Sequence, residues 1–220
     1  MANIGLITGG TDAVGEGTAV RIACVGDSIT WGACILHRKR DCYPAQLQRL
    51  LGDGVVVGNF GMISHTLQES GDYPYRNCKP YLRSGEFAPD VVLIMLGTND
   101  SKANNWKSPA PFLEDYRTLV EHYRALPTAP RIFVMTPPTV YGHGRTDKVK
   151  YTVSVEAIDQ MCTVVGDLAR GEGLGLIDAH AATQGHPELF WYDGVHPNAV
   201  GAALIAQAVY EVLAPEPASP

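Results

Sequence analysis

The sequence lacks the marks of several protein classes. No run reaches the roughly 18 apolar residues of a membrane-spanning helix, and 45% hydrophobic content is too high for a disordered chain. Lysine and arginine number 17 against 23 aspartate and glutamate, a net charge of −6. This balance predicts neither nucleic acid nor an anionic membrane as a partner. No internal repeat and no long Ser/Gly linker is present, so we predict one soluble globular domain.

Cysteine is also too scarce and too irregular to build a scaffold. The five cysteines are an odd number without a Cys-x-x-Cys pair, which argues against a disulfide framework or a structural zinc site. Asp178, His180 and His186 are close in sequence but lack a repeated ligand spacing. We therefore predict no metal and no other cofactor, with this cluster as the alternative metal site.

The two ends of the chain carry little sequence information. Residues 1–5 lack the basic segment and apolar core of a signal peptide, which predicts a cytoplasmic protein. Removal of a signal peptide would leave a similar start, so secretion is the alternative. We predict an N-terminal arm over residues 1–19, a single domain over 20–214 and a tail over 215–220. The sequence leaves open whether the domain is a monomer or a homo-oligomer.

A glycine-rich stretch over residues 8–17 imitates a dinucleotide-binding loop, with Asp27 about twenty residues downstream of its start. That motif needs a strand before the glycines and a helix directly after them. Only four strand-like residues precede this stretch, and the next apolar run begins at Val20. We interpret it as part of the arm.

Apolar runs and helical patterns alternate along the rest of the chain. The runs are continuous rather than alternating, as in strands covered on both faces of a parallel sheet; they span residues 20–25, 55–60, 91–96, 131–135 and 174–177. Helical patterns span 43–51, 112–123, 153–169 and 197–213. In the last, Pro197 fits a first turn, and apolar residues recur at i+4, namely Val200, Leu204, Ala208 and Val212. The order predicts an α/β fold, a three-layer α/β/α sandwich around a five-stranded parallel sheet.

Function in such folds gathers where the strands end. Ser28 follows the first strand at a predicted strand-to-helix turn, where it is either a nucleophile or, with Asp27, an ordinary helix cap. Gly61 follows the second strand, and Asn99 follows the third. Glycine and asparagine are both common in turns. The backbone N–H of Gly61 and the side-chain amide of Asn99 can, however, also donate to an oxyanion.

The segment before the last helix holds an aspartate three residues ahead of a histidine, Asp193 and His196. An aspartate at this spacing can accept a hydrogen bond from the imidazole Nδ1–H, which leaves Nε2 free to take a proton from a serine. An Asp-x-x-His alone is more often a surface loop. Its combination with the strand-end residues predicts one hydrolytic site.

Four blocks of sequence carry a resemblance to a known family. They are Gly26-Asp27-Ser28, Asn59-Phe60-Gly61, Gly97-Thr98-Asn99-Asp100 and Asp193-Gly194-Val195-His196-Pro197. Together they resemble the GDSL/SGNH hydrolase superfamily, in the same order and over residues 26–197. The family's first block usually ends in leucine where Ile29 stands, a departure that its esterase-type branches share.

The resemblance implies a serine esterase with a flavodoxin-like sheet and no metal. Ser28 would attack the ester, and His196, oriented by Asp193, would act as base and then as acid. The amides of Ser28 and Gly61 and the side chain of Asn99 would form the oxyanion hole.

Within the superfamily, the chain looks like the small carbohydrate O-acetylesterases, whose substrates include acetylated xylan, pectin fragments and sialic acid. The predicted partner is a small-molecule or oligosaccharide ester. Three aromatic residues near the blocks, Trp31, Tyr73 and Trp106, are candidates to stack on a sugar, with plain packing as the alternative. His143 lies in the loop over 137–150, which either lines the substrate cleft or is solvated. Two alternatives remain: a lysophospholipase or thioesterase for longer acyl esters, and a catalytically silent binding module.

Overall fold

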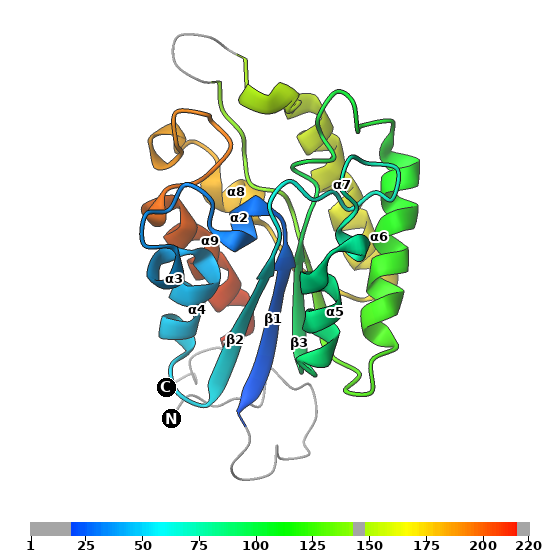
Figure 1. Cartoon of the computed structure of the whole chain (residues 1–220), viewed down its shortest axis with the longest axis vertical. Coiled ribbons are helices and arrows are strands. Elements are labelled where there is room, and N and C mark those ends of the chain that lie inside the picture. The colour runs from blue at the N-terminus through cyan, green and yellow to red at the C-terminus, as the bar shows by residue number, and fades with distance from the viewer. Residues whose placement is uncertain (1–18, 143–147, 215–220) are drawn as a thin grey trace.

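Five parallel strands form the centre of the molecule (Figure 1). The computed structural model describes residues 19–142 and 148–214. The strands are paired in the order β2-β1-β3-β4-β5, with bounds β1 Val20–Gly26, β2 Val55–Gly61, β3 Val91–Met95, β4 Arg131–Met135 and β5 Gly175–Ile177. This is the strand order of flavodoxin-like sheets. The predicted fold class is confirmed, and the strands lie within one or two residues of the predicted runs.

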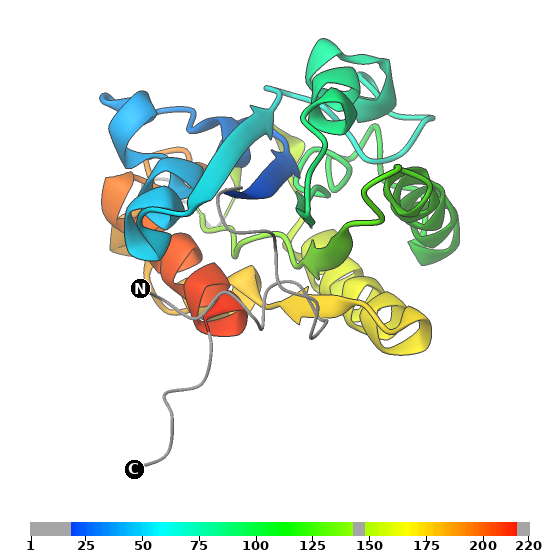
Figure 2. The ribbon, with the colours of Figure 1, turned by 90° about the horizontal axis from the view of Figure 1, so that it is seen from below.

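Helices cover both faces of the sheet, as the view from below shows (Figure 2). One layer holds α5 (Lys79–Glu86), α6 (Pro109–Arg124) and α7 (Val155–Glu172). The other holds α4 (Tyr43–Leu51), α9 (Ala199–Leu213) and the short α8 (Ala179–Thr183), with α3 (Arg38–Asp41) beside α4. The four-residue α2 (Ser28–Trp31) follows β1. Short 3₁₀ turns span Tyr75–Asn77, Lys150–Thr152 and Pro187–Leu189.

The double cover explains the unbroken apolar runs. In β1, Ile22 and Cys24 pack in the core on the α4 and α9 side, whereas Ala23 and Val25 pack against the α5–α7 layer. Successive side chains of a strand point to opposite faces, so both sets must be apolar when both faces are buried. All four of these side chains are fully buried.

The structure corrects the prediction for the last helix. Helix α9 begins at Ala199, and Pro197 lies before it; the Asn198 side chain caps the helix by accepting from the N–H groups of Val200 and Gly201. Val200 and Val212 are 58% and 46% exposed, so the i+4 series does not face the core. The buried face instead contains Ala202, Ile205, Ala206, Val209 and Leu213. Because this helix is apolar on nearly every side, its periodicity could not identify the packed face.

The predicted arm, including the glycine-rich stretch, and the predicted tail lie almost wholly outside the described residues, so their bounds stay predictions. Among residues 19–142 and 148–214, no helix has the length and apolar character needed to cross a membrane.

Candidate active site

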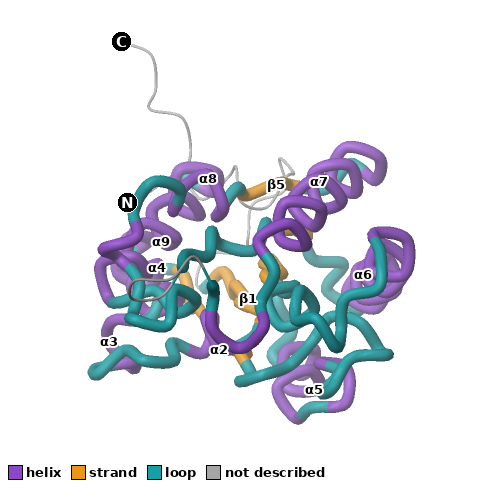
Figure 3. Tube along the Cα trace, turned by 90° about the horizontal axis from the view of Figure 1, so that it is seen from above, coloured by secondary structure: helices purple, strands orange, loops and turns teal. Residues whose placement is uncertain are grey.

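The predicted catalytic side chains meet at the carboxyl edge of the sheet, the upper edge in Figure 1. Ser28 opens α2 directly after β1, and Figure 3 shows α2 beside the end of β1 when the molecule is seen from above. Asn99 lies in the turn after β3, and Asp193 and His196 lie in the segment that leads to α9. Segments up to 168 residues apart in sequence therefore build one site.

The turn at Ser28 depends on its two preceding residues. A Cβ atom on Gly26 would lie 2.0 Å from Thr30 Oγ1 and 2.6 Å from the Met95 carbonyl oxygen, so only glycine fits. The Asp27 carboxylate accepts a hydrogen bond from the Ile29 N–H at 2.9 Å and caps α2. Because Asp27 is the cap, the Ser28 hydroxyl is free for another role.

Ser28, His196 and Asp193 form a continuous hydrogen-bonded chain. Ser28 Oγ lies 2.9 Å from His196 Nε2, and His196 Nδ1 lies 2.8 Å from Asp193 Oδ2. A carboxylate can only accept, so Nδ1 carries the proton and Nε2 offers its lone pair to the serine O–H. This arrangement can remove the serine proton as the hydroxyl attacks a carbonyl carbon.

Asp193 is buried but charged. Burial alone raises its pKa, but hydrogen bonds from the His196 ring and from the N–H groups of His196 and Val195 lower the pKa to about 2. Gly194 makes the tight turn possible, since it has a φ of +71° and a Cβ there would lie 1.8 Å from the Tyr141 carbonyl oxygen. The carboxylate therefore holds the imidazole in one tautomer at neutral pH.

Two of the three predicted oxyanion donors have an N–H available. In the part of the chain that the structure describes, the Ser28 backbone N–H has no acceptor. Asn99 donates one amide N–H to the His65 carbonyl at 3.1 Å, which leaves the second for a ligand. The Gly61 N–H instead donates to Asn59 Oδ1 at 3.0 Å. Its role as an oxyanion donor stays a prediction, one that requires this bond to be shared or broken.

A pocket of about 210 Å³ opens at these residues. Besides Ser28, Asn99 and His196, its wall includes Thr98 and Val195 from the sequence blocks. It also includes residues that the sequence analysis did not select, namely Ala33, Ile63, Ser64, Lys102, Tyr151 and Val153. Tyr151 has a φ of +62°, uncommon for a residue with a side chain, and its ring lies 6.1 Å from that of His196. Lys102 lies three residues after Asn99, and Ile63 and Ser64 lie two and three residues after Gly61, so closeness to the blocks is a sequence signal that could have indicated them.

Among the residues that the structure describes, Trp31, Tyr73 and Trp106 do not line this pocket. Trp31 is stacked under the Arg38 guanidinium at 4.0 Å, and Trp106 packs edge-on against Phe112 at 5.8 Å. Tyr73 is 59% exposed, with its ring 6.0 Å from that of His65. His143 lies outside the described residues. Binding of substrate by these four residues stays a prediction.

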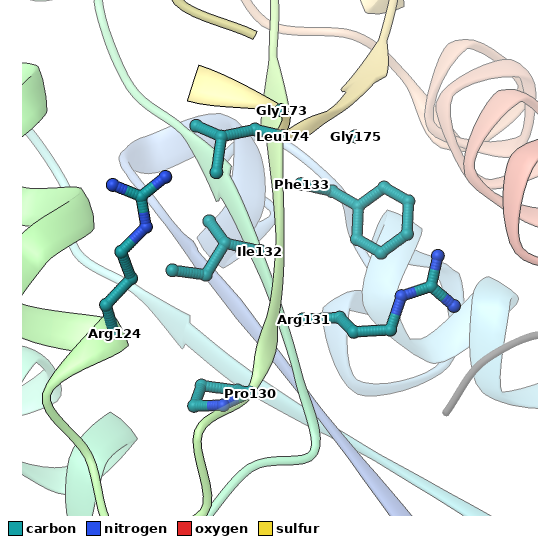
Figure 4. Close-up of a pocket in the computed structure, with 8 residues that line it drawn as sticks. All are labelled: Arg124, Pro130, Arg131, Ile132, Phe133, Gly173, Leu174 and Gly175. Carbon is teal, nitrogen blue, oxygen red and sulfur yellow. The ribbon is translucent and has the colours of Figure 1, made fainter. Parts of the chain in front are cut away.

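A second pocket lies at the opposite, amino edge of the sheet and does not fit the same chemistry. Figure 4 shows it between the start of β4 and the end of α7, with Arg124 and Arg131 on opposite sides of the β4 ribbon. Its wall is completed by Pro130, Ile132, Phe133, Gly173, Leu174 and Gly175, none of which is a nucleophile or a base. The carboxyl edge is therefore the candidate active site.

Two buried carboxyl groups, those of Asp27 and Asp100, stabilise the turns that carry the site residues. Burial raises the pKa of Asp27 to about 6 and that of Asp100 to about 7. Asp100 accepts from the N–H groups of Leu67 and Gln68, at 2.9 and 2.7 Å, and so ties the loop after β2 to the turn after β3. These bonds fix the turn that carries Asn99.

We predict that Asp27→Asn makes the protein's stability less dependent on pH. A folded-state pKa of about 6 against 3.8 means that the native carboxyl contributes stability below pH 4, which is lost as pH rises through 6. Asparagine keeps an oxygen for the cap. The difference in free energy of unfolding, variant minus parent, should rise by on the order of 3 kcal/mol from pH 4 to pH 8. Urea unfolding at each pH measures it. Asp53→Asn, which removes an exposed carboxylate, is the control; an equal pH dependence in Asp27→Asn and parent contradicts the assignment.

The alternative metal cluster does not assemble. Asp178 caps α8, His180 faces Asp159 at 3.8 Å, and His186 pairs with Glu188 at 3.2 Å. Within the described ranges, the metal-ligating atoms that do come together, within 4.8 Å, are those of Cys34, Asp193 and His196. Both ring nitrogens of His196 already have partners, Ser28 at Nε2 and Asp193 at Nδ1, so a metal ion there would have to displace one of them.

We therefore predict that EDTA leaves ester hydrolysis unchanged, since serine, histidine and amide donors supply the nucleophile, the base and the oxyanion contacts. The measurement is the rate of acetyl ester hydrolysis before and after dialysis against the chelator. Loss of activity that a divalent ion restores would contradict the prediction.

Comparisons with known proteins agree with this geometry. Residues 24–204 match the sequence profile of the GDSL-like lipase/acylhydrolase family. An acetylxylan esterase of Xylanibacter ruminicola is 35% identical over 209 residues, which cover 87% of this chain and 42% of the relative. The chain thus spans less than half the length of that protein.

Solved structures share the fold at low sequence identity. A carbohydrate acetylesterase from Sinorhizobium meliloti is 19% identical with a TM-score of 0.72, over 87% of this chain and 97% of the other. An aryl esterase from M. smegmatis is 21% identical with a TM-score of 0.73, over 88% and 97% of the two chains. The family match covers most of the residues between the first strand and the last helix, and the resemblance predicted from the four sequence blocks is confirmed: this chain belongs to the GDSL-like lipase/acylhydrolase family.

Proposed function

We propose that this chain is a serine esterase that hydrolyses acetyl esters of carbohydrates through a covalent acetyl-enzyme. The observation that carries the proposal is the hydrogen-bonded chain from Asp193 through His196 to Ser28, which ends at a pocket that Asn99 also lines. Membership of an acylhydrolase family supports the same class of reaction.

The reaction proceeds in two stages. Ser28 Oγ attacks the ester carbonyl while His196 Nε2 takes its proton, and the Ser28 N–H and Asn99 amide stabilise the oxyanion. The tetrahedral intermediate then expels the sugar alkoxide, which His196 protonates. Water next attacks the acetyl-serine with His196 as base, and collapse releases acetate and restores the Ser28 hydroxyl.

The preference for a short acyl group is supported by the size of the pocket. Its volume of about 210 Å³ is below the roughly 300–1,000 Å³ of pockets that hold drug-sized ligands. Ile63, Val153 and Val195 provide apolar wall for an acetyl methyl group. The curated relative is an acetylxylan esterase, and one structural neighbour is a carbohydrate acetylesterase. Both names support an acetylated carbohydrate as the substrate class.

The test has two parts. Acetate release is measured from acetylated xylan, acetylated pectin fragments and O-acetylated sialic acid, and p-nitrophenyl esters of increasing chain length are compared in parallel. We expect acetate from at least one carbohydrate and a kcat/KM that falls steeply beyond the shortest esters, because a small pocket excludes longer chains. Highest activity on long-chain esters would instead favour a lysophospholipase or thioesterase, and no hydrolysis of any ester would favour a binding module.

A further inference from the structure

Lys102 occupies a fixed position in the wall of the active site. Its N–H donates to the Asn99 carbonyl at 3.4 Å, and its own carbonyl accepts from the N–H groups of Asn105 and Trp106, both at 2.9 Å. An isolated antiparallel bridge pairs it with Val153, on the other side of the pocket's rim. The backbone of Lys102 is therefore anchored to the turn that carries Asn99.

The ammonium group of Lys102 has no counter-ion in the site. Lys102 is half-buried and lines the pocket with Ser28 and Asn99, but no ion pair or hydrogen bond joins its Nζ to any residue of 19–142 or 148–214. Burial dominates the raised pKa of Asp27, and the positive charge of Lys102 acts to lower that pKa, so the ammonium is within electrostatic range of the turn that carries Ser28. Lys102 thus lines the same pocket as Ser28 and Asn99, and its ammonium has donors available for a ligand.

The charge of the other lining residues of the pocket is compatible with a negatively charged ligand. The lining residues include no aspartate and no glutamate, although the chain as a whole carries a net charge of −6. A second lysine, Lys150, precedes the pocket residue Tyr151 and holds its Nζ 4.3 Å from the Tyr192 ring. A half-buried cation in a pocket whose lining residues include no acid favours an anionic ligand, because the nearby carboxylate of Asp193 is already paired with His196.

We propose that Lys102 selects acetyl esters whose alcohol part carries a carboxylate, as acetylated uronic acids do. The inference rests on the proposed esterase function and specifies the substrate. An acetyl group is too small to carry a second functional group, so the carboxylate belongs to the alcohol. An ammonium is a compact point charge that suits a singly charged group.

The experiment uses substrate pairs that differ only in charge. One pair is an O-acetylated methyl glucuronoside and its neutral methyl ester, and the other is 4-acetoxybenzoate and its methyl ester. For each protein, the charge preference is kcat/KM for the anionic ester divided by kcat/KM for the neutral one. Any general loss of activity cancels in this ratio. The proteins are the parent, Lys102→Met, Lys102→Arg and the control Lys107→Met, at an exposed lysine of the same loop.

We expect Lys102→Met to lower the charge preference about tenfold, the size of one partly exposed charge-assisted hydrogen bond. Lys102→Arg should retain most of the preference, and Lys107→Met should match the parent. In the parent, 0.5 M NaCl should weaken the preference, because salt screens charges that solvent can reach.

The outcomes separate this inference from the function on which it rests. An unchanged ratio in Lys102→Met overturns the inference, even if both rates fall together, because Lys102 then acts on the oxyanion or on the fold. Absence of acetate release from both glucuronosides contradicts an acetylated uronic acid as the substrate. Absence of release from every carbohydrate of the panel contradicts the proposed function, and the aryl pair still measures the effect of Lys102.

Discussion

Ser28→Ala should lower kcat for p-nitrophenyl acetate by at least about 10⁴-fold. The substitution removes the only protein atom that the proposed mechanism bonds to the acyl group. The remaining oxyanion donors and pocket give only the residual catalysis of a site without a nucleophile. Measurement of kcat under saturating ester gives the result directly.

The loss should occur without loss of structure. Ser28 is 6% exposed, and its hydroxyl has one described partner, His196, so alanine removes one hydrogen bond and creates no steric conflict. The melting temperature should stay within a few degrees of the parent's, and Ser70→Ala, at an exposed serine, is the activity control. A folded Ser28→Ala protein that keeps most of its activity would contradict the nucleophile assignment.

Asn99→Ala should lower kcat by roughly 10²–10³-fold, about 3–4 kcal/mol, with little change in KM. The free N–H of the Asn99 amide meets negative charge that develops only as the carbonyl carbon becomes tetrahedral. Its loss therefore raises the transition state more than the bound substrate. Steady-state kinetics on one acetyl ester separates the two parameters.

The matched control for Asn99 lies in the same loop. Asn104 is exposed and its amide donates to Asp72, outside the pocket, so Asn104→Ala should leave both kcat and KM near those of the parent. If Asn99→Ala raises KM and leaves kcat unchanged, then Asn99 binds the ground state and the oxyanion assignment is wrong. The bond from Asn99 to the His65 carbonyl is also lost, so unfolding is measured alongside.

The central sheet could be predicted closely from the sequence because burial on both faces makes each strand a continuous apolar run. Helix α5 gave no clear pattern, since only Tyr81 and Ser84 of its eight residues are buried. Helix α9 gave too broad a pattern, and its packed face is set by small residues such as Ala202 and Ala206. Helix periodicity is informative only when one face is polar.

The position of Ser28 could be predicted because it directly follows β1, at the edge where the carboxyl ends of parallel strands meet. Asp193 and His196 could be predicted from their spacing in the segment before α9. The pocket wall could not, because Tyr151 and Val153 come from a loop whose path depends on contacts with Ala103 and Ser101. The hydrogen bond from the Gly61 N–H to the Asn59 side chain could not be predicted from the sequence either. The burial that raises the pKa values of Asp27 and Asp100 likewise depends on the assembled turns.

Covalent labelling tests the central claim, that Ser28 is a nucleophile activated by His196, most directly. The intact protein is treated with a fluorophosphonate, and the mass increase, the labelled peptide and residual acetyl ester hydrolysis are followed together. We predict one adduct per chain, on Ser28, with activity lost in proportion to labelling and with labelling greatly slowed in His196→Ala. Full labelling at another residue, or full activity in protein labelled at Ser28, would contradict the claim.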